Sequence, residues 1–177
     1  MRRKDREVTD NTKINQIIKS CNYCRLGFND NGRVYIVPMN FGYEELPVSN
    51  SKSSEQMIKN KTQASERSPI KVFYFHCARE GRKVRLIKET GYAAFELDCG
   101  YELLEGETPC THSAKFQSVI GEGNIVVIEN KAEKIHALNC IMKQAAGKSD
   151  FQFLDSMLNT VFVFKLEVTE ISCKEHI

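Results

Sequence analysis

Three features are missing from this sequence, and each absence excludes a class of protein or of binding partner. No stretch is long and apolar enough to span a bilayer as a helix. The first residues, MRRKDREVTD, are charged and lack the apolar core of a secretory signal, so we expect a cytoplasmic protein without a membrane partner. The net charge of +2 is too small to indicate a nucleic-acid partner.

Complete nucleotide and metal motifs are also missing. Neither G-x-x-x-x-G-K-[ST] nor G-x-G-x-x-G occurs, so an NTPase or dinucleotide-binding site is not supported. Cys21 and Cys24 form a lone C-x-x-C, which would suit a redox pair or half of a zinc site. No second C-x-x-C exists, and Cys99 and Cys110 are too far apart to replace one. We therefore predict no metal site and free thiols, with redox activity of the C-x-x-C left open.

The 177 residues are enough for one domain with a real core, spanning residues 1–177. The best hairpin signal is the turn NDNG, where Gly32 can supply a positive φ between two strands. Pro38 lies in the second of these strands and cannot donate to a sheet. This strand should therefore be an edge strand or be broken at the proline, which leaves backbone groups for a ligand.

Residues 45–69 differ from the rest of the chain. They are rich in Ser, Lys, Asn and Gln and contain almost nothing to bury. A structureless loop of this length within a compact domain is unusual. We interpret it as a solvated, mobile insertion between two strands, with a lid or a partner-binding loop as the alternative.

The rest of the chain reads as strands joined to strands. Further strands are expected at 71–76, 92–98, 115–128 and 161–171, and helices at 14–21, 82–89, 131–145 and 152–158. Residues 99–114 are expected to form a loop, and in the last strand Val163 should share the wetter face. Regular alternation of strand and helix is missing. We therefore predict a mainly β, α+β fold, an antiparallel barrel of about six strands with peripheral helices.

Positive charge gathers where a strand passes into a helix, in VFYFHCAREGRKVRLIKE at 72–89. Gly81 frees the backbone there, and a helix that begins at this point directs unpaired N–H groups outward. Arg82 and Lys83 in its first turn oppose the helix dipole, a cost that a bound anion such as phosphate would offset. His76 could donate a further hydrogen bond. The alternative is a solvated basic helix face with an incidental histidine.

Several segments, in this order, resemble the flavin-binding split-barrel superfamily related to pyridoxamine 5′-phosphate oxidase. They are MRRKDREV at the start, GRVYIVPMNFGY at 32–43, YFHCAREGRKVRLI at 74–87, KFQSVIGEG at 115–123 and VFKLEVTEI at 163–171. Within that superfamily they are most similar to the 5-nitroimidazole resistance (Nim-type) branch. The resemblance covers nearly the whole chain, except for the insertion at 45–69, where relatives usually have a shorter connection.

The resemblance implies a split β-barrel that forms a homodimer, with FMN in a cleft at the subunit interface. Carried onto this sequence, the implied cofactor-binding residues are Val37, Pro38, Met39 and Asn40 along the ring, His76, Cys77 and Ala78 along the ring and ribityl chain, Lys83 beside Gly81 at the phosphate, and Ser118 and Val119 from the long strand. The final strand or the 99–114 loop of the partner would close the cleft.

The implied function is an FMN-dependent oxidoreductase, in which the flavin passes hydride or electrons to a small aromatic acceptor such as a nitroimidazole. His76 is the best candidate for a catalytic acid, although it could equally be a phosphate or ring contact. His112 is expected to be a surface histidine. Two alternatives stay open: oxidation of pyridoxamine 5′-phosphate, which the mixed, acidic tail EVTEISCKEHI disfavours, and a module that holds flavin or haem without turnover.

Overall fold

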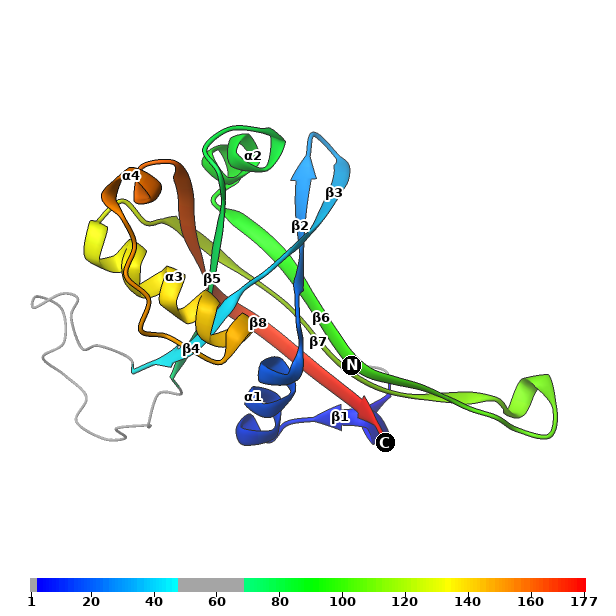
Figure 1. Ribbon diagram of the computed structural model, residues 1–177. Coiled ribbons are helices and arrows are strands. Elements are labelled where there is room, and N and C mark those ends of the chain that lie inside the picture. Colours follow the sequence, from blue (N-terminus) through cyan, green and yellow to red (C-terminus); the bar gives the residue numbers. More distant parts are fainter. Residues whose placement is uncertain (1–2, 48–68) are drawn as a thin grey trace, which may run out of the picture.

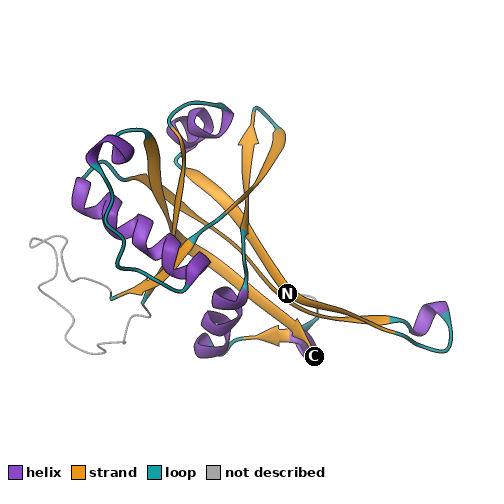
Figure 2. Ribbon diagram, viewed as in Figure 1, coloured by secondary structure: helices purple, strands orange, loops and turns teal. Residues whose placement is uncertain are grey.

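The computed structural model describes residues 3–47 and 69–177, which form one antiparallel sheet (Figures 1 and 2). Its strands are β1 (Glu7–Val8), β2 (Cys24–Asp30), β3 (Arg33–Met39), β4 (Gly42–Leu46), β5 (Ile70–Ala78), β6 (Tyr92–Leu104), β7 (Ser113–Val127) and β8 (Val161–His176). The order across the sheet is β3-β2-β6-β7-β8-β5-β4, and β1 pairs with β8. The six expected strands are present, but the second, expected over residues 33–43, ends at Met39, and its last two residues begin the separate strand β4; the short β1 is additional.

The sheet curves around a single interior, which makes it a split barrel. Phe73 of β5 and Phe95 of β6 have ring centroids 4.9 Å apart, although β7 and β8 separate their strands within the sheet. The two strands at the ends of the sheet, β3 and β4, follow each other in the chain and are not hydrogen bonded to each other. The predicted fold class is therefore confirmed, and the break in the barrel lies between β3 and β4.

The described residues also form four helices and two short 3₁₀ turns, which lie around the sheet. They are η1 (Lys4–Arg6), α1 (Asn11–Ser20), α2 (Arg82–Thr90), η2 (Pro109–Thr111), α3 (Lys131–Ala146) and α4 (Asp155–Leu158). Asp10 caps α1 by accepting a hydrogen bond from the Lys13 backbone N–H, and Asn130 does the same for the first turn of α3. No helix in the described parts of the chain is long and apolar enough to cross a membrane.

The beginning of strand β8 is covered on both faces, which corrects the expectation for Val163. Phe162, Phe164 and Leu166 face the barrel interior, where aromatic rings dominate the core. Val163 faces outward, yet it is fully buried because α3 packs over that face of β5 and β8. The two-residue periodicity was correct, but an overlying helix cannot be read from the alternation of one strand.

The expected loop at 99–114 is wrong for half of its residues, because 99–104 and 113–114 belong to strands and only 105–112 form the connection. Strand β6 continues to Leu104, and β6 and β7 form a long hairpin that projects from the barrel (Figure 1). The pairing shifts register between Cys99 and Glu102, where Gly100 has φ 69°. A glycine at a β-bulge gives the same local signal as a glycine in a turn, so the sequence alone did not distinguish them.

The β2–β3 hairpin agrees with its prediction. Gly32 has φ 83°, its backbone N–H donates to the Asn29 side chain, and β3 is an edge strand of the sheet. Pro38 sits on this edge strand opposite Arg25. Of the proposed insertion, residues 45 and 46 belong to β4, whereas residues 48–68, with the lid and partner-loop hypotheses, lie outside the described residues.

Candidate functional site

The side chain of Lys83, from the start of α2, contacts the end of β3 and lies near the end of β5, which leads along the chain to α2 in Figure 1. The Lys83 ammonium lies 2.8 Å from the Met39 sulfur, across 44 residues of sequence. Its charge also reaches two residues of β5: it adds to the effect of burial in lowering the pKa of His76, and it partly opposes burial, which raises the pKa of Cys77. Four of the predicted cofactor-binding residues, from three different elements, therefore lie close together.

Gly81 sets the backbone at this point. It is the N-cap of α2, with φ 120° and ψ 175°, a backbone conformation that residues other than glycine rarely adopt. No side chain caps the helix, and its first turn contains no acidic residue. The first N–H groups of α2 are therefore available to an anion beside Lys83.

Part of the basic cluster is neutralised within the protein. Asp30, at the end of β2, pairs with both Arg82 (2.7 Å) and Arg85 (2.8 Å), and Arg85 also pairs with Glu89. Arg82 also lies over the ring of Tyr35, 4.5 Å from its centroid. The two arginines thus fasten α2 to the β2–β3 hairpin, so an external anion is not needed to explain them.

Lys83 differs from these arginines. Among the described residues it forms no ion pair, and its ammonium group contacts a thioether sulfur, which carries no charge. Its side chain is half-buried, so its charge is not freely solvated. Arg79 and Lys88 of the same segment also form no ion pair among the described residues, but both are exposed to solvent, whereas Lys83 is half-buried at the start of α2.

The link between α2 and the hairpin should depend on pH through Asp30. The two arginines hold the pKa of its carboxyl below the ordinary 3.8. Because the folded pKa is the lower one, the stabilisation is fully present above about pH 3.8 and is lost as pH falls through the folded value. We expect Asp30→Asn to remove this part of the acid sensitivity, measured by thermal unfolding from about pH 2 to pH 5. The control is Asp150→Asn, at an exposed position, and equal pH profiles for wild type and Asp30→Asn would contradict the assignment.

His76 carries a shifted pKa for identifiable reasons. Partial burial of the imidazole, followed by repulsion from Lys83, lowers its pKa below the ordinary 6.5. The ring is therefore neutral at pH 7 and can offer one N–H and one lone pair. The other predicted contacts Pro38, Asn40 and Ala78 are exposed, whereas Val37 is partly buried and packs against the barrel core.

Ser118 and Val119 are not brought to this place within one chain. They lie on β7, where Ser118 pairs with Lys174 of β8, whereas His76 pairs with Val163 of the same strand. Lys174 and Val163 are eleven positions apart on β8, which is about 35 Å at about 3.3 Å per residue. The side chain of Val119 is, in addition, fully buried in the core.

The remaining cysteine and histidine predictions concern positions away from this place. All seven cysteines are free thiols. Cys21 and Cys24 are fully buried, and burial raises the pKa of each well above its ordinary value, so neither is a ready thiolate. His112 is exposed, and its Nδ1 lies 2.9 Å from the Thr108 carbonyl oxygen, as expected for a surface histidine.

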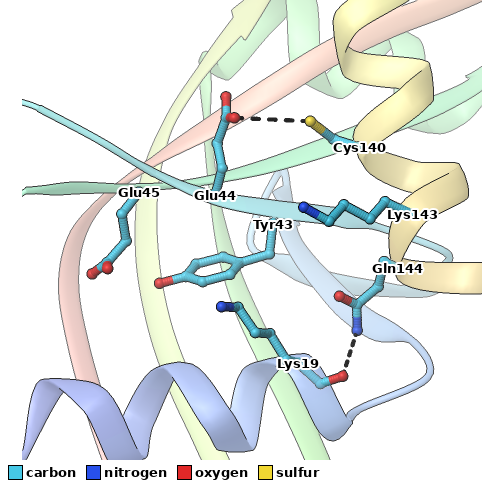
Figure 3. A pocket seen from close by; sticks show the side chains of 7 residues that line it. All are labelled: Lys19, Tyr43, Glu44, Glu45, Cys140, Lys143 and Gln144. Atoms are coloured by element: carbon cyan, nitrogen blue, oxygen red, sulfur yellow. Dashed lines mark hydrogen bonds between the residues drawn. The ribbon is translucent and has the colours of Figure 1, made fainter. Parts of the chain in front are cut away.

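One group of chemically capable side chains was missed. A cavity of about 420 Å³ lies between β4, α1 and α3, lined by Lys19, Tyr43, Glu44, Glu45, Cys140, Lys143 and Gln144 (Figure 3). Beside it, Glu44, His136 and Cys140 direct their polar atoms toward one another. The spacing of His136 and Cys140, four residues apart on a helix, was a visible signal, but Glu44 is 92 residues from His136 and gave none.

Comparisons with known proteins agree with this architecture. A model of the family described as pyridoxamine 5′-phosphate oxidase matches residues 10–175. A crystal structure of a candidate 5-nitroimidazole antibiotic resistance protein from Bacteroides thetaiotaomicron superposes with a TM-score of 0.73 and 26% identity, over 96% of this chain and 86% of that one. No curated protein matches the sequence significantly.

Two more distant structures share the fold alone. A flavocytochrome from Azotobacter vinelandii has a TM-score of 0.72 at 16% identity, over 100% of this chain and 72% of that one. An FAD and heme binding protein from Mycobacterium smegmatis has a TM-score of 0.71 at 12% identity, over 96% of this chain and 73% of that one. At these identities the two relatives support the barrel and say nothing about individual residues.

Proposed function

The chain belongs to the pyridoxamine 5′-phosphate oxidase family, and from this premise we propose that it is an FMN-dependent oxidoreductase that reduces small aromatic nitro compounds. The whole chain would act as one flavin-binding domain. The observation that carries the proposal is the Lys83 ammonium, which has no ion-pair partner among the described residues and lies beside the uncapped start of α2. A phosphate monoester is the anion that such a place suits best.

The surrounding residues fit the rest of the cofactor. We assign the phosphate to Lys83 and the backbone at Gly81, the ring to the strand residues Val37, Pro38, Met39 and Asn40, and the ring edge and ribityl chain to His76, Cys77 and Ala78. Because Pro38 has no N–H and lies on the outermost strand, the edge there is not committed to another strand. A flat ring can therefore lie along it.

The second half of the cleft would come from another copy of the chain. Ser118 and Val119 are too far along β8 from His76 to reach the same ligand in one chain. The exposed Val34 and Ile36, on the outer face of β3, are an apolar surface that a partner would cover. We therefore propose a homodimer in which each site takes residues from both chains.

When bound, FMN would supply the exchange of hydride or electrons with the acceptor. The protein would hold the ring against the β3 edge, anchor its phosphate through Lys83 and keep one face open to a flat substrate. His76 would act as a neutral hydrogen-bonding group at pH 7, because its pKa is lowered by burial and by Lys83. It becomes a proton donor only in more acidic solution.

The choice of a nitro compound rests on one relative. The Bacteroides protein, at 26% identity over 96% of this chain, is described as a candidate 5-nitroimidazole antibiotic resistance protein. A nitroimidazole is flat and electron-poor, and it would need several two-electron turnovers to reach the amine. The segment EVTEISCKEHI at 167–177, which, apart from its last residue, forms the second part of β8, contains no cluster of basic residues for a second phosphate, which makes pyridoxamine 5′-phosphate the weaker substrate candidate.

The test is reoxidation of the reduced flavin without oxygen. The purified protein, supplied with FMN and reduced with dithionite, should be reoxidised rapidly by 2-methyl-5-nitroimidazole and not by 2-methylimidazole, its counterpart without the nitro group. Free reduced FMN at equal concentration gives the background rate. If the nitro compound reoxidises bound and free flavin equally fast, the protein is a flavin-binding module without this activity. If no flavin is retained, the cofactor assignment itself is wrong.

A further inference from the structure

Three metal-binding side chains converge where α3 crosses β4, away from the proposed flavin site. His136 Nε2 lies 2.9 Å from Glu44 Oε1 and 3.5 Å from Cys140 Sγ, and Cys140 Sγ lies 3.9 Å from Glu44 Oε2. Figure 3 shows Cys140 on α3 pointing toward the carboxylate of Glu44 on β4. All three potential ligand atoms lie within 4.8 Å of one another.

The fold places these groups by two simple devices. His136 and Cys140 are one turn apart on α3, so both project from the same side of the helix. Gly42, two residues before Glu44, has no side chain, and an added Cβ would lie 2.5 Å from the backbone of Cys140 and Ile141. The helix can therefore approach β4 closely enough for Cys140 to face Glu44.

Tyr74 of β5 contacts two members of the cluster, Glu44 and His136. Its hydroxyl donates a hydrogen bond to the Glu44 carboxylate, and its ring meets the His136 imidazole edge-on, with centroids 5.6 Å apart. Hydrogen bonds that orient a ligand in this way are typical of the surroundings of bound metals.

The geometry differs from a catalytic relay. In a Cys–His–acid arrangement the two ring nitrogens divide the work, one facing the sulfur and the other the carboxylate. Here a single nitrogen, His136 Nε2, faces both the Cys140 sulfur and the Glu44 carboxylate. Three donor atoms therefore surround one common point instead of forming a chain.

The separations suit a tetrahedral ion at that point. Bonds of about 2.0–2.1 Å to nitrogen, about 2.0–2.2 Å to oxygen and about 2.3 Å to sulfur place tetrahedral ligands about 3.3–3.6 Å apart. The distance from nitrogen to sulfur, 3.5 Å, lies within this range, whereas the distance from nitrogen to Glu44 Oε1, 2.9 Å, is shorter and that from sulfur to Glu44 Oε2, 3.9 Å, is longer. Small side-chain rotations would equalise them.

We propose that Glu44, His136 and Cys140 bind Zn²⁺, with the fourth position open to solvent. A thiolate, an imidazole and a carboxylate together favour zinc over magnesium or calcium, which prefer oxygen alone. The fourth position faces the cavity of about 420 Å³, where water or a small anion can enter. This site would be additional to the flavin site and does not depend on the proposed function.

Two charged side chains, Glu44 and Lys143, affect the pKa of the Cys140 thiol, which must lose its proton to bind zinc. Burial and the Glu44 carboxylate raise the pKa of Cys140 to about 11, and the nearby Lys143 acts in the opposite direction. Lys143 also lines the cavity, so it can pair with an anion at the fourth position.

The test is metal binding to the full chain. Protein freed of metal with a chelator, retaining any flavin, is titrated with Zn²⁺ against a chromophoric indicator and separately with Co²⁺. We expect one zinc per chain, and at least tenfold weaker binding in both His136→Ala and Cys140→Ser. Cobalt should give a sulfur-to-metal absorption band, measured as a difference spectrum, that Cys140→Ser abolishes.

Matched controls are the exposed Cys110→Ser and His112→Ala, which remove the same groups elsewhere and should leave binding unchanged. His136 is exposed on a helix, so alanine there should fold normally, which thermal unfolding without metal would verify. The proposal is overturned if wild type binds no zinc, or if the ligand variants and the controls bind it equally.

Discussion

Replacing Lys83 with alanine should weaken FMN binding by about 10- to 100-fold. A hydrogen bond to a charged group contributes about 1.5–3 kcal/mol, and each 1.4 kcal/mol changes an equilibrium constant tenfold. The effect should be large at this position because no anion among the described residues pairs with the ammonium, so its charge is available to a ligand. Fluorescence quenching of FMN on titration with protein gives both dissociation constants.

Riboflavin provides the decisive control, because it has the same ring and ribityl chain without the phosphate. Wild type and Lys83→Ala should bind riboflavin with equal affinity if Lys83 holds the phosphate alone. Lys88→Ala removes a charge from the exposed last turn of the same helix and should leave FMN binding unchanged. If Lys83→Ala weakens both flavins equally, Lys83 supports the fold of the site; if it weakens neither, the phosphate binds elsewhere.

Local features of the fold could be predicted because their causes are local. The turn at Gly32, the edge strand with Pro38 and the basic helix after Gly81 each follow from the conformational limits of a few residues. The burial of Val163 could not, because it depends on α3, a helix that comes earlier in the chain and packs on the outside of β8. A strand sequence records how its own faces alternate and not what covers them.

The basic segment at 72–89 shows the same difference between what neighbouring residues determine and what distant residues determine. The sequence placed the charges correctly, but it could not show that Asp30 neutralises two arginines from 52 and 55 residues away. Once those pairs are known, the anion hypothesis depends on Lys83 and on the uncapped start of α2, which makes it easier to test. The cluster of Glu44, His136 and Cys140 was not predicted from the sequence at all. The C-x-x-C at Cys21 and Cys24 drew attention to other cysteines, and both of these are buried.

The contact between α3 and β4 should depend strongly on Gly42, and Gly42→Ala is expected to destabilise the protein by about 3 kcal/mol. The added methyl group would lie 2.5 Å from backbone atoms of α3, which cannot rotate away as a side chain could, so the helix must move. Overpacking of this kind costs about 1–3 kcal/mol, and a backbone neighbour favours the upper end. With about 2–4 °C per kcal/mol for a chain of this size, the melting temperature should fall by about 6–12 °C.

The matched control is Gly27→Ala, in strand β2, where the new Cβ would lie 3.9 Å from its nearest neighbours, an ordinary van der Waals distance. Removing the freedom of a glycine in the unfolded chain should make this variant neutral or more stable, by up to about 1 kcal/mol. Both variants make the same chemical change within strands, so the difference between their melting temperatures isolates the approach of α3. Equal melting temperatures would show that α3 can shift without cost, in which case the packing of the helix on Gly42 would not be what holds Cys140 opposite Glu44.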